Sequence, residues 1–229
     1  MSTAALAPLP NAPARDLATA QLHLTHIHVD YEQAARLLKI RDTYDWHQLV
    51  WQAFAGRDGE ARDFIVRIDQ KEEAFRVLVL SRTAPTRPDW CPSAGFATKP
   101  IPDTFFAHPE FSFSLLANPT KKIRSNATGE RTKNGRRVPL STREDLLIWL
   151  QRKGDAAGFT FDSATTQTVP RGREYFQKEK PRTYGLHAAV EFRGRLRVID
   201  PALFRTAVAT GLGSAKAFGF GLLVLAPVS

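Results

Sequence analysis

Near its C-terminus the chain reads Gly211-Leu212-Gly213-Ser214-Ala215-Lys216-Ala217-Phe218-Gly219-Phe220-Gly221. Two Gly-apolar-Gly turns flank five residues, of which Lys216 is basic. Paired glycines let a backbone turn sharply and approach a partner closely. Their N–H groups and Lys216 favour an anionic partner. We call this stretch the glycine-rich loop, and its glycines are Gly211, Gly213, Gly219 and Gly221.

Local signals predict the elements on either side of the glycine-rich loop. Asp200 and Pro201 suit the N-cap and first position of a helix, which Gly211 would end in the left-handed conformation. The apolar run 222–225 suits a buried strand. A Walker loop is excluded because it needs Gly-Lys-Ser/Thr, and a dinucleotide fingerprint is excluded because its helix follows the glycines. The alternative is a helix C-cap running into a Gly-rich strand.

Composition bounds the class of protein. A length of 229 residues allows one large domain or two small ones, and 43% hydrophobic residues are ordinary for a globular protein. We expect no membrane span and no secretory signal. The single cysteine, Cys91, excludes an internal disulfide and a cysteine-based zinc site, so a cytoplasmic location is expected. A nucleophilic role for Cys91 is the alternative, but no activating partner is evident.

The net charge of +9 is concentrated in two segments. Residues 121–137 hold seven basic residues and one acid, and residues 171–182 carry +3, so the rest of the chain is neutral. We expect two basic loops, the second at a hairpin tip, that contact a phosphate backbone; solvated loops are the alternative. The candidate contacts are Lys121, Lys122, Arg136, Arg137, Arg171, Arg173, Lys178 and Lys180, with Lys216 of the glycine-rich loop.

The first half of the chain has the element order β-α-β-β-(α)-β of a ferredoxin-like module. Residues 1–20 precede it as a predicted disordered extension, because they are rich in Ala and Pro without a periodic pattern. Asp30 and Gln33 form a capping box that opens a short helix. The strands are predicted at 22–29, 64–68, 74–80 and near the end of 83–103, and a second helix at 44–54.

The second half repeats this order after a break near His108. A strand at 111–117 precedes the first basic segment, and Ser141 caps a helix that ends at Gly154. Strand-rich stretches at 159–169 and 184–198, with a turn at Arg193-Gly194, lead to the last helix. The predicted fold is therefore α+β, with two tandem ferredoxin-like (RRM-like) domains at 21–107 and 108–229.

The helix predicted at 44–54 carries an apolar stripe, with Tyr44, His47 and Trp51 on its flank. On residues alone, Tyr44 and His47 are better explained as partly buried structural side chains on the helix flank. His23, His26 and His28 are better explained as ordinary strand residues than as metal ligands, because His23 opposes the other two on a strand. We therefore expect no metal site.

The glycine-rich loop resembles the signature of the RAMP superfamily of CRISPR proteins, and its continuation to Pro227 resembles the CasE family of Cascade-associated endoribonucleases. Tyr44-x-x-His47-x-x-apolar-Trp51 follows a pattern of that family. Two further blocks, Leu116-Ala117-Asn118-Pro119-Thr120-Lys121 and Gly135-Arg136-Arg137-Val138-Pro139-Leu140, are also similar. The resemblance covers about residues 21–227, and tandem ferredoxin-like domains are the fold it implies.

The resemblance implies a function. His47 and Tyr44 would be the catalytic pair of a metal-independent endoribonuclease that cleaves CRISPR repeat stem-loop RNA in precursor transcripts. It would use no cofactor and stay bound beside other Cascade subunits. Some relatives have a basic residue directly after the histidine, where this chain has Gln48, so Lys39, Arg41 and Lys216 remain open as its substitute. The alternatives are a non-catalytic RNA-binding RAMP subunit and, more weakly, a generic RNA-recognition module.

Overall fold

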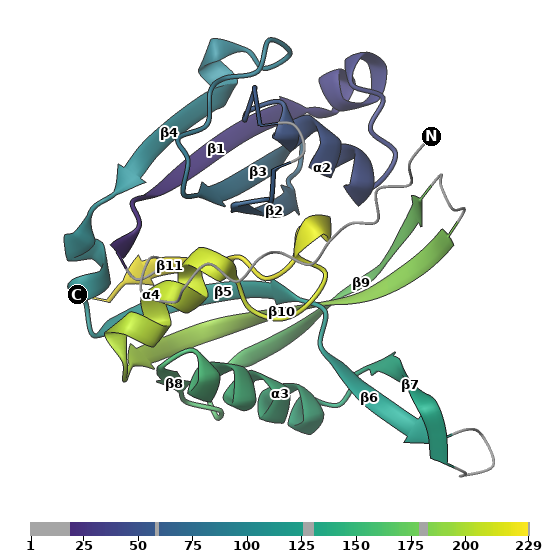
Figure 1. Ribbon diagram of the computed structural model, residues 1–229, viewed down its shortest axis with the longest axis vertical. Helices are drawn as coiled ribbons and strands as arrows, with labels where there is room; N and C mark the ends of the chain where they lie inside the picture. Colours follow the sequence, from purple (N-terminus) through teal and green to yellow (C-terminus); the bar gives the residue numbers. More distant parts are fainter. Residues whose placement is uncertain (1–18, 58–59, 126–130, 179–182, 229) are drawn as a thin grey trace.

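The computed structural model describes residues 19–57, 60–125, 131–178 and 183–228. The predicted extension at 1–20 therefore lies almost wholly outside the described residues, as does Lys180 of the second basic segment. Two main antiparallel sheets and their helices form an α+β structure (Figure 1). In this view the first sheet lies above the second, and the glycine-rich loop runs between them.

The first sheet contains every strand predicted for the first half of the chain. Its order is β2-β3-β1-β4, and the pairs are antiparallel. Asp30 Oδ1 accepts a hydrogen bond from Gln33 N at 2.7 Å, so the predicted cap is confirmed, although the turn that follows is π-helical. The elements are β1 (Leu22–Asp30), η1 (Gln33–Leu37), α2 (Thr43–Trp51), β2 (Phe64–Gln70), β3 (Ala74–Ser81), η2 (Ser93–Gly95) and β4 (Phe96–Ile101).

The two faces of the first sheet serve two different cores. Val77 and Val79 of β3 pack with the buried residues of α2, Trp46 and Val50. The intervening Leu78, like Leu80, belongs to the larger core of the second half. Successive side chains of a strand point to opposite faces, so one strand supports both layers. The position of α2 relative to the second half is therefore fixed by apolar packing through this sheet.

The second sheet has the order β11-β5-β10-β8, and β9 extends it by pairing with β10. Asp200 caps the last helix as predicted, because its Oδ1 accepts from the N–H groups of Ala202 and Leu203 at 3.0 Å. The elements are η3 (Asp103–Ala107), β5 (Glu110–Ala117), β6 (Thr120–Ser125), β7 (Arg131–Pro139), α3 (Arg143–Ala156), β8 (Phe159–Phe161), β9 (Gln167–Lys178), β10 (Thr183–Val198), α4 (Pro201–Thr210), η4 (Lys216–Phe218) and β11 (Leu223–Pro227).

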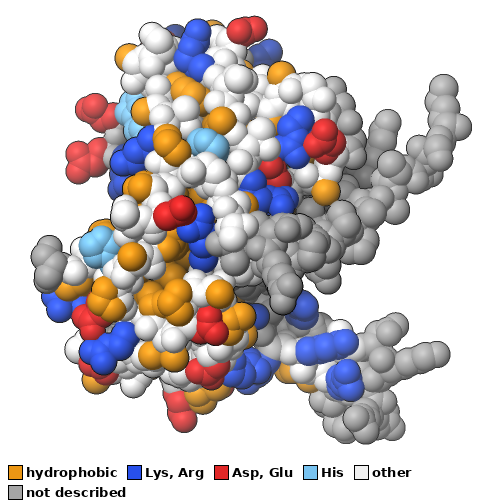
Figure 2. All heavy atoms as spheres, turned by 60° about the vertical axis from the view of Figure 1, so that its left-hand side comes forward, with side chains coloured by type: hydrophobic (Ala, Val, Ile, Leu, Met, Phe, Trp, Pro, Cys, Tyr) orange, Lys and Arg blue, Asp and Glu red, His pale blue; other side chains and the backbone are white. Residues whose placement is uncertain are grey.

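The first basic segment is a strand pair rather than the predicted loop. β6 and β7 pair antiparallel, with Lys121 opposite Val138 and Lys122 opposite Arg137. The hairpin projects from the body of the protein (Figure 1), and Lys and Arg side chains are visible on this arm at the lower right of Figure 2. The second basic segment lies on the predicted hairpin, since Thr183 of β10 pairs with Lys178 of β9.

Three local predictions were wrong. Two of them concern glycines that allow close packing instead of ending an element. The N-cap of α3 is Thr142, whose Oγ1 accepts from Asp145 N at 3.2 Å, rather than Ser141. Gly154 does not end α3: it lies inside the helix, where a Cβ would stand 2.7 Å from the Phe159 carbonyl oxygen. Gly194 is not in a turn either, because β10 passes through it and a Cβ there would meet Thr166 Oγ1 at 2.8 Å.

A buried ion-pair network also joins the two sheets. Glu191 of β10 is 1% exposed and accepts hydrogen bonds from Arg67 of β2 at 2.8 Å and from Ser114 of β5 at 2.6 Å. Arg171 and Arg193 donate to its other oxygen, each at 2.8 Å. A buried carboxylate with this many donors is well compensated. Arg67 therefore ties the first sheet to the second at a defined point.

Candidate functional site

Helix α2 places Tyr44 and His47 at the surface of the first half. The helix begins at Asp42, whose Oδ1 accepts from Tyr44 N at 2.8 Å and Asp45 N at 3.2 Å. Trp46 and Val50 are buried, so the stripe predicted to face the core does so. Tyr44 and His47 lie one turn apart on the flank, and both are half-buried. The structure therefore places these two side chains on one surface, as the sequence predicts.

The imidazole of His47 is enclosed by aromatic side chains. Its Nε2 accepts a hydrogen bond from Trp51 Nε1 at 3.1 Å, and its ring centroid lies 6.2 Å from those of Trp51 and Phe64. Nδ1 is buried without a hydrogen-bond partner in the described structure. Burial first, and then the positive charge of Arg62, lower the pKa of His47 to about 4. His47 is therefore neutral near neutral pH, with a lone pair that can accept a proton.

Arg62, which precedes β2, belongs to the same cluster. Its guanidinium carbon lies 5.9 Å from the centroid of the Phe64 ring, the ring that also neighbours His47. Burial lowers the pKa of Arg62. Burial, the charge of Arg62 and the charge of Lys153 lower the pKa of Lys216, in that order. The electrostatic coupling thus runs from α2 through Arg62 to the glycine-rich loop and α3.

The glycine-rich loop is packed rather than open. Gly211, Gly213, Gly219 and Gly221 all have positive φ, between 75° and 91°. Gly211 is not in the predicted left-handed helical conformation, because its ψ is 159°. Gly221 N donates to the carbonyl oxygen of Leu116 at 2.8 Å, and Lys216 Nζ donates to that of Thr210 at 2.7 Å. These hydrogen bonds hold the loop in place. The sequence instead predicted that the N–H groups of the loop face an anion.

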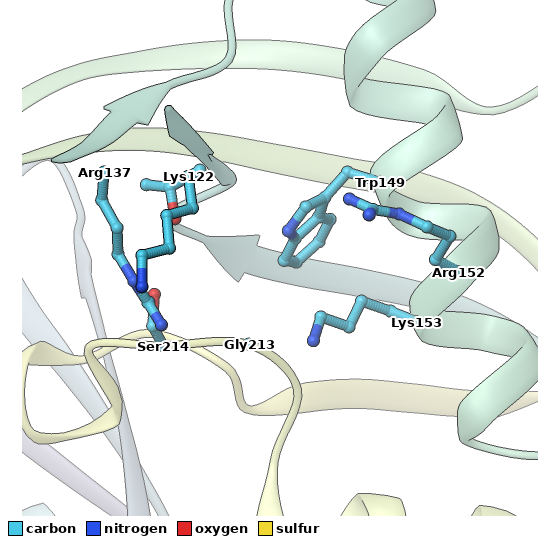
Figure 3. A pocket seen from close by; sticks show the side chains of 8 residues that line it. Lys122, Arg137, Trp149, Arg152, Lys153, Gly213 and Ser214 are labelled. Atoms are coloured by element: carbon cyan, nitrogen blue, oxygen red, sulfur yellow. The ribbon is translucent and has the colours of Figure 1, made fainter. Parts of the chain in front are cut away.

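A basic pocket of about 360 Å³ lies beside this loop. Figure 3 shows Lys122 and Arg137 of the β6–β7 hairpin directed toward Ser214, and Lys153 of α3 directed toward Gly213. Four cationic side chains around one cavity favour a polyanionic ligand. We call this cavity the basic pocket, and its lining residues are Thr120, Lys122, Arg137, Trp149, Arg152, Lys153, Gly213 and Ser214.

A family model described as CRISPR associated protein matches residues 22–227. The chain is 30% identical over 191 residues to the CRISPR system Cascade subunit CasE of Escherichia coli strain K12, and the match covers 82% of this chain and 94% of CasE. The chain belongs to the CasE family of CRISPR-associated proteins.

Two further comparisons support membership of the CasE family. The CRISPR-associated endoribonuclease Cse3 of Thermus thermophilus is 27% identical over 218 residues, which are 89% of this chain and 99% of Cse3. A structure of Thermus thermophilus Cse3 bound to an RNA representing a pre-cleavage complex superposes with a TM-score of 0.68. That match has 27% identity and covers 90% of this chain and 100% of the Cse3 chain.

The predicted RNA contacts of this CasE family member occupy different environments. Lys122 and Arg137 line the basic pocket. Arg171 is held by Glu191, although its side chain remains 48% exposed, and Arg173 is exposed. Lys121 Nζ lies 3.4 Å from Asp145 Oδ2. Arg136 and Lys178 lie in β7 and β9, but their side chains, like all of Lys180, are outside the described residues.

Sequence reasoning did not single out three cations of the candidate site: Arg62, Arg152 and Lys153. Arg152-Lys153 is a basic pair in a predicted helix, so its spacing could have directed attention to it. Arg62 stands alone between Ala61 and Asp63, and its relation to His47 arises only from the tertiary fold.

No metal site is found in the described part of the chain, where no three His, Cys, Asp or Glu side chains are grouped so as to hold an ion. None of the described helices is long and apolar enough to span a membrane.

Proposed function

We propose that this chain is a metal-independent endoribonuclease that cleaves CRISPR repeat stem-loop RNA in precursor transcripts and stays bound to the mature crRNA as a Cascade subunit. The observation that carries the proposal is the His47 imidazole, which is neutral near neutral pH and shares contact with the Phe64 ring with the cation Arg62. The relatives support it: one is named an endoribonuclease and has been solved with RNA, and another is named a Cascade subunit.

The reaction needs a base, a source of protons and charge stabilisation. His47 takes the proton of the ribose 2′-hydroxyl, and the 2′-oxygen forms a bond to phosphorus as the bond to the 5′-oxygen breaks. The leaving 5′-oxygen takes a proton from water, and the hydroxide that remains takes back the proton held by the His47 imidazolium. The products are therefore a 2′,3′-cyclic phosphate and a 5′-hydroxyl, and the imidazole is neutral again. A neutral imidazole is the required form of the base. Tyr44, one turn away, orients the 2′-hydroxyl through its phenolic O–H.

We assign RNA binding to the two basic segments and the basic pocket. An A-form stem hides its base edges in a deep groove, so proteins hold it largely by shape and phosphates. Lys122, Arg137, Arg152 and Lys153 surround one cavity that suits a phosphate of the backbone. The other assigned contacts are Lys121, Arg136, Arg171, Arg173, Lys178, Lys180 and Lys216.

One observation favours a non-catalytic RNA-binding subunit as the second candidate. The Nε2 atom of His47 already accepts a hydrogen bond from Trp51, and Nδ1 is buried. A histidine fixed in this way would be structural. The two candidates make opposite predictions for the same substitution.

The deciding experiment is cleavage of a repeat stem-loop RNA in EDTA by the unchanged protein and by His47→Ala. We expect cleavage without metal, a cyclic phosphate on the upstream product, and a loss of ~10²–10⁴-fold with Ala at 47. His28→Ala is the matched control, because His28 is an exposed histidine on β1. Full cleavage by His47→Ala, or strict dependence on added Mg²⁺, would refute the proposed function.

We also propose that residues 21–107 and 108–229 are two ferredoxin-like domains. Each main sheet has the same order when its strands are ranked along the chain: β4-β1-β3-β2 in the first, and β11-β5-β10-β8 in the second. This is the split βαβ arrangement, with β6–β7 and β9 as additions. Because its substrate would be a newly made transcript, we place the protein in the cytoplasm.

A further inference from the structure

Cleavage of a phosphodiester adds negative charge around phosphorus, and a cation near that position stabilises it. The sequence left Lys39, Arg41 and Lys216 as candidates, since Gln48 follows His47. In the structure Arg41 donates to Asp45 through Nε and Nη2, at 3.2 and 3.3 Å. Lys216 Nζ donates to the Thr210 carbonyl oxygen at 2.7 Å. These two side chains are already engaged in holding the ends of α2 and α4.

Arg62 meets the requirement for a cation near phosphorus better than Arg41 or Lys216. Its guanidinium and the His47 imidazole both neighbour the Phe64 ring, at 5.9 and 6.2 Å from its centroid. Its Nη1 atom is buried without a hydrogen-bond partner in the described structure. A buried donor that makes no hydrogen bond destabilises a fold unless something else accepts from it. An anionic oxygen at this position would satisfy the donor and lie close to His47.

The charges around Arg62 point the same way. Among the described residues, the charge acting most strongly on His47 is that of Arg62, which also acts on Lys216. Lys216 is in turn affected by Lys153 of the basic pocket. Neighbouring cations repel one another unless an anion lies between them. Arg62 is thus coupled electrostatically both to the His47 imidazole and to Lys216 of the second half.

We propose that the Arg62 guanidinium contacts the phosphate at which His47 acts and stabilises the charge that develops there, an inference that rests on the proposed function. As the 2′-oxygen attacks, the non-bridging oxygens of that phosphate gain negative charge and accept hydrogen bonds from Arg62. The guanidinium stays protonated throughout, so the proton balance of the reaction is unchanged. Arg62 replaces, from another element, the basic residue that some relatives place directly after the histidine.

The test uses Arg62→Met, which removes the charge and fills the same buried volume. Single-turnover cleavage of the repeat stem-loop should fall ~100-fold or more. Binding of an RNA with a 2′-deoxy nucleotide at the cut should weaken much less. Since Arg62 has no ion-pair partner among the described residues and its Nη1 atom is buried, the melting temperature should stay the same or rise. Arg62→Lys should recover part of the cleavage rate, and Arg36→Gln, at an exposed arginine paired with Glu32, is the matched control.

The outcomes separate this inference from the proposed function. If the unchanged protein cleaves and His47→Ala does not, but Arg62→Met cleaves within about twofold of the unchanged rate, the inference alone is refuted. A lower melting temperature for Arg62→Met would show a packing role and also refute it. Absence of cleavage by the unchanged protein would refute the proposed function and this inference with it.

Discussion

The indole Nε1–H of Trp51 donates a hydrogen bond to Nε2 of His47 across 3.1 Å. The two residues are four apart on α2, so the helix itself brings them together. This bond fixes the proton of the neutral ring on Nδ1, since Nε2 must offer its lone pair. For Nε2 to receive a proton from RNA, the bond to Trp51 must first be broken.

Trp51→Phe should therefore speed cleavage, because it removes the donor that competes for Nε2. A neutral hydrogen bond contributes about 0.5–1.5 kcal/mol, so we expect a gain of roughly two- to tenfold. The pKa of His47 should rise from about 4, since the bond stabilises the neutral form. Single-turnover cleavage and an NMR titration of His47 measure the two effects. Trp90→Phe is the control, and slower cleavage by a folded Trp51→Phe would contradict the prediction.

Glu191 should make the protein sensitive to acid. Burial alone would raise its pKa, but hydrogen bonds from Arg193, Ser114, Arg67 and Arg171 outweigh burial and hold it far below the ordinary 4.5. Its stabilising contribution is therefore complete above 4.5 and is lost as the pH falls toward the folded-state pKa.

Glu191→Gln should lower the free energy of unfolding at neutral pH by about 3–5 kcal/mol, because it leaves buried cations without their anion. Between neutral pH and pH values below 4.5, the variant should lose less stability than the unchanged protein. Urea denaturation across this range measures both effects, with Glu110→Gln as control, because the Glu110 side chain is 36% exposed. If the free energy of unfolding falls equally with pH for Glu191→Gln and the unchanged protein, the assigned role of Glu191 is wrong.

The basic pocket should contribute to RNA affinity without sequence preference. Arg152→Ala and Lys153→Ala should each weaken binding and reduce the slope of log affinity against log salt by about 1. Fluorescence anisotropy with a repeat stem-loop at several salt concentrations provides the measurement. Arg36→Ala, at an exposed arginine paired with Glu32, should leave the slope unchanged. Equal slopes for all three variants would remove the pocket from the RNA-binding surface.

Gly221 should tolerate no side chain. It has a φ of +91°, and a Cβ would lie 2.6 Å from the Leu212 carbonyl oxygen. Gly56 has a similar φ of +80° with open space around it. Gly56→Ala should cost only the backbone term of about 1–2 kcal/mol, and Gly221→Ala should cost clearly more. Thermal denaturation compares them, and equal losses would mean that the loop can adjust to the added methyl group.

Signals that act over a few residues were predictable. The caps at Asp30 and Asp200 follow from a side chain and the N–H groups just beyond it. Gly154 and Gly194 were misread because they were taken as local punctuation. Their reason lies in residues brought near by folding, Phe159 and Thr166.

The same distinction applies to the candidate site. Tyr44 and His47 share a helix flank, so their relation could be predicted from spacing alone. The relation of Arg62 to His47 could not be predicted, because only the tertiary fold brings both side chains to the Phe64 ring. Pairing of β6 with β7 was missed since high charge conceals strand periodicity.

The packing of the glycine-rich loop sets the order in which the protein can be completed. Gly211 and Gly219 fit against Ile65 and Ile68 of the first sheet, while Gly213 fits against Trp149 of the second half. This loop leaves the ribosome after every other helix and strand except β11, so a nascent chain that ends before it exposes those apolar side chains. A stalled or shortened chain would therefore be a target for chaperones, and could not place Lys216 near Arg62.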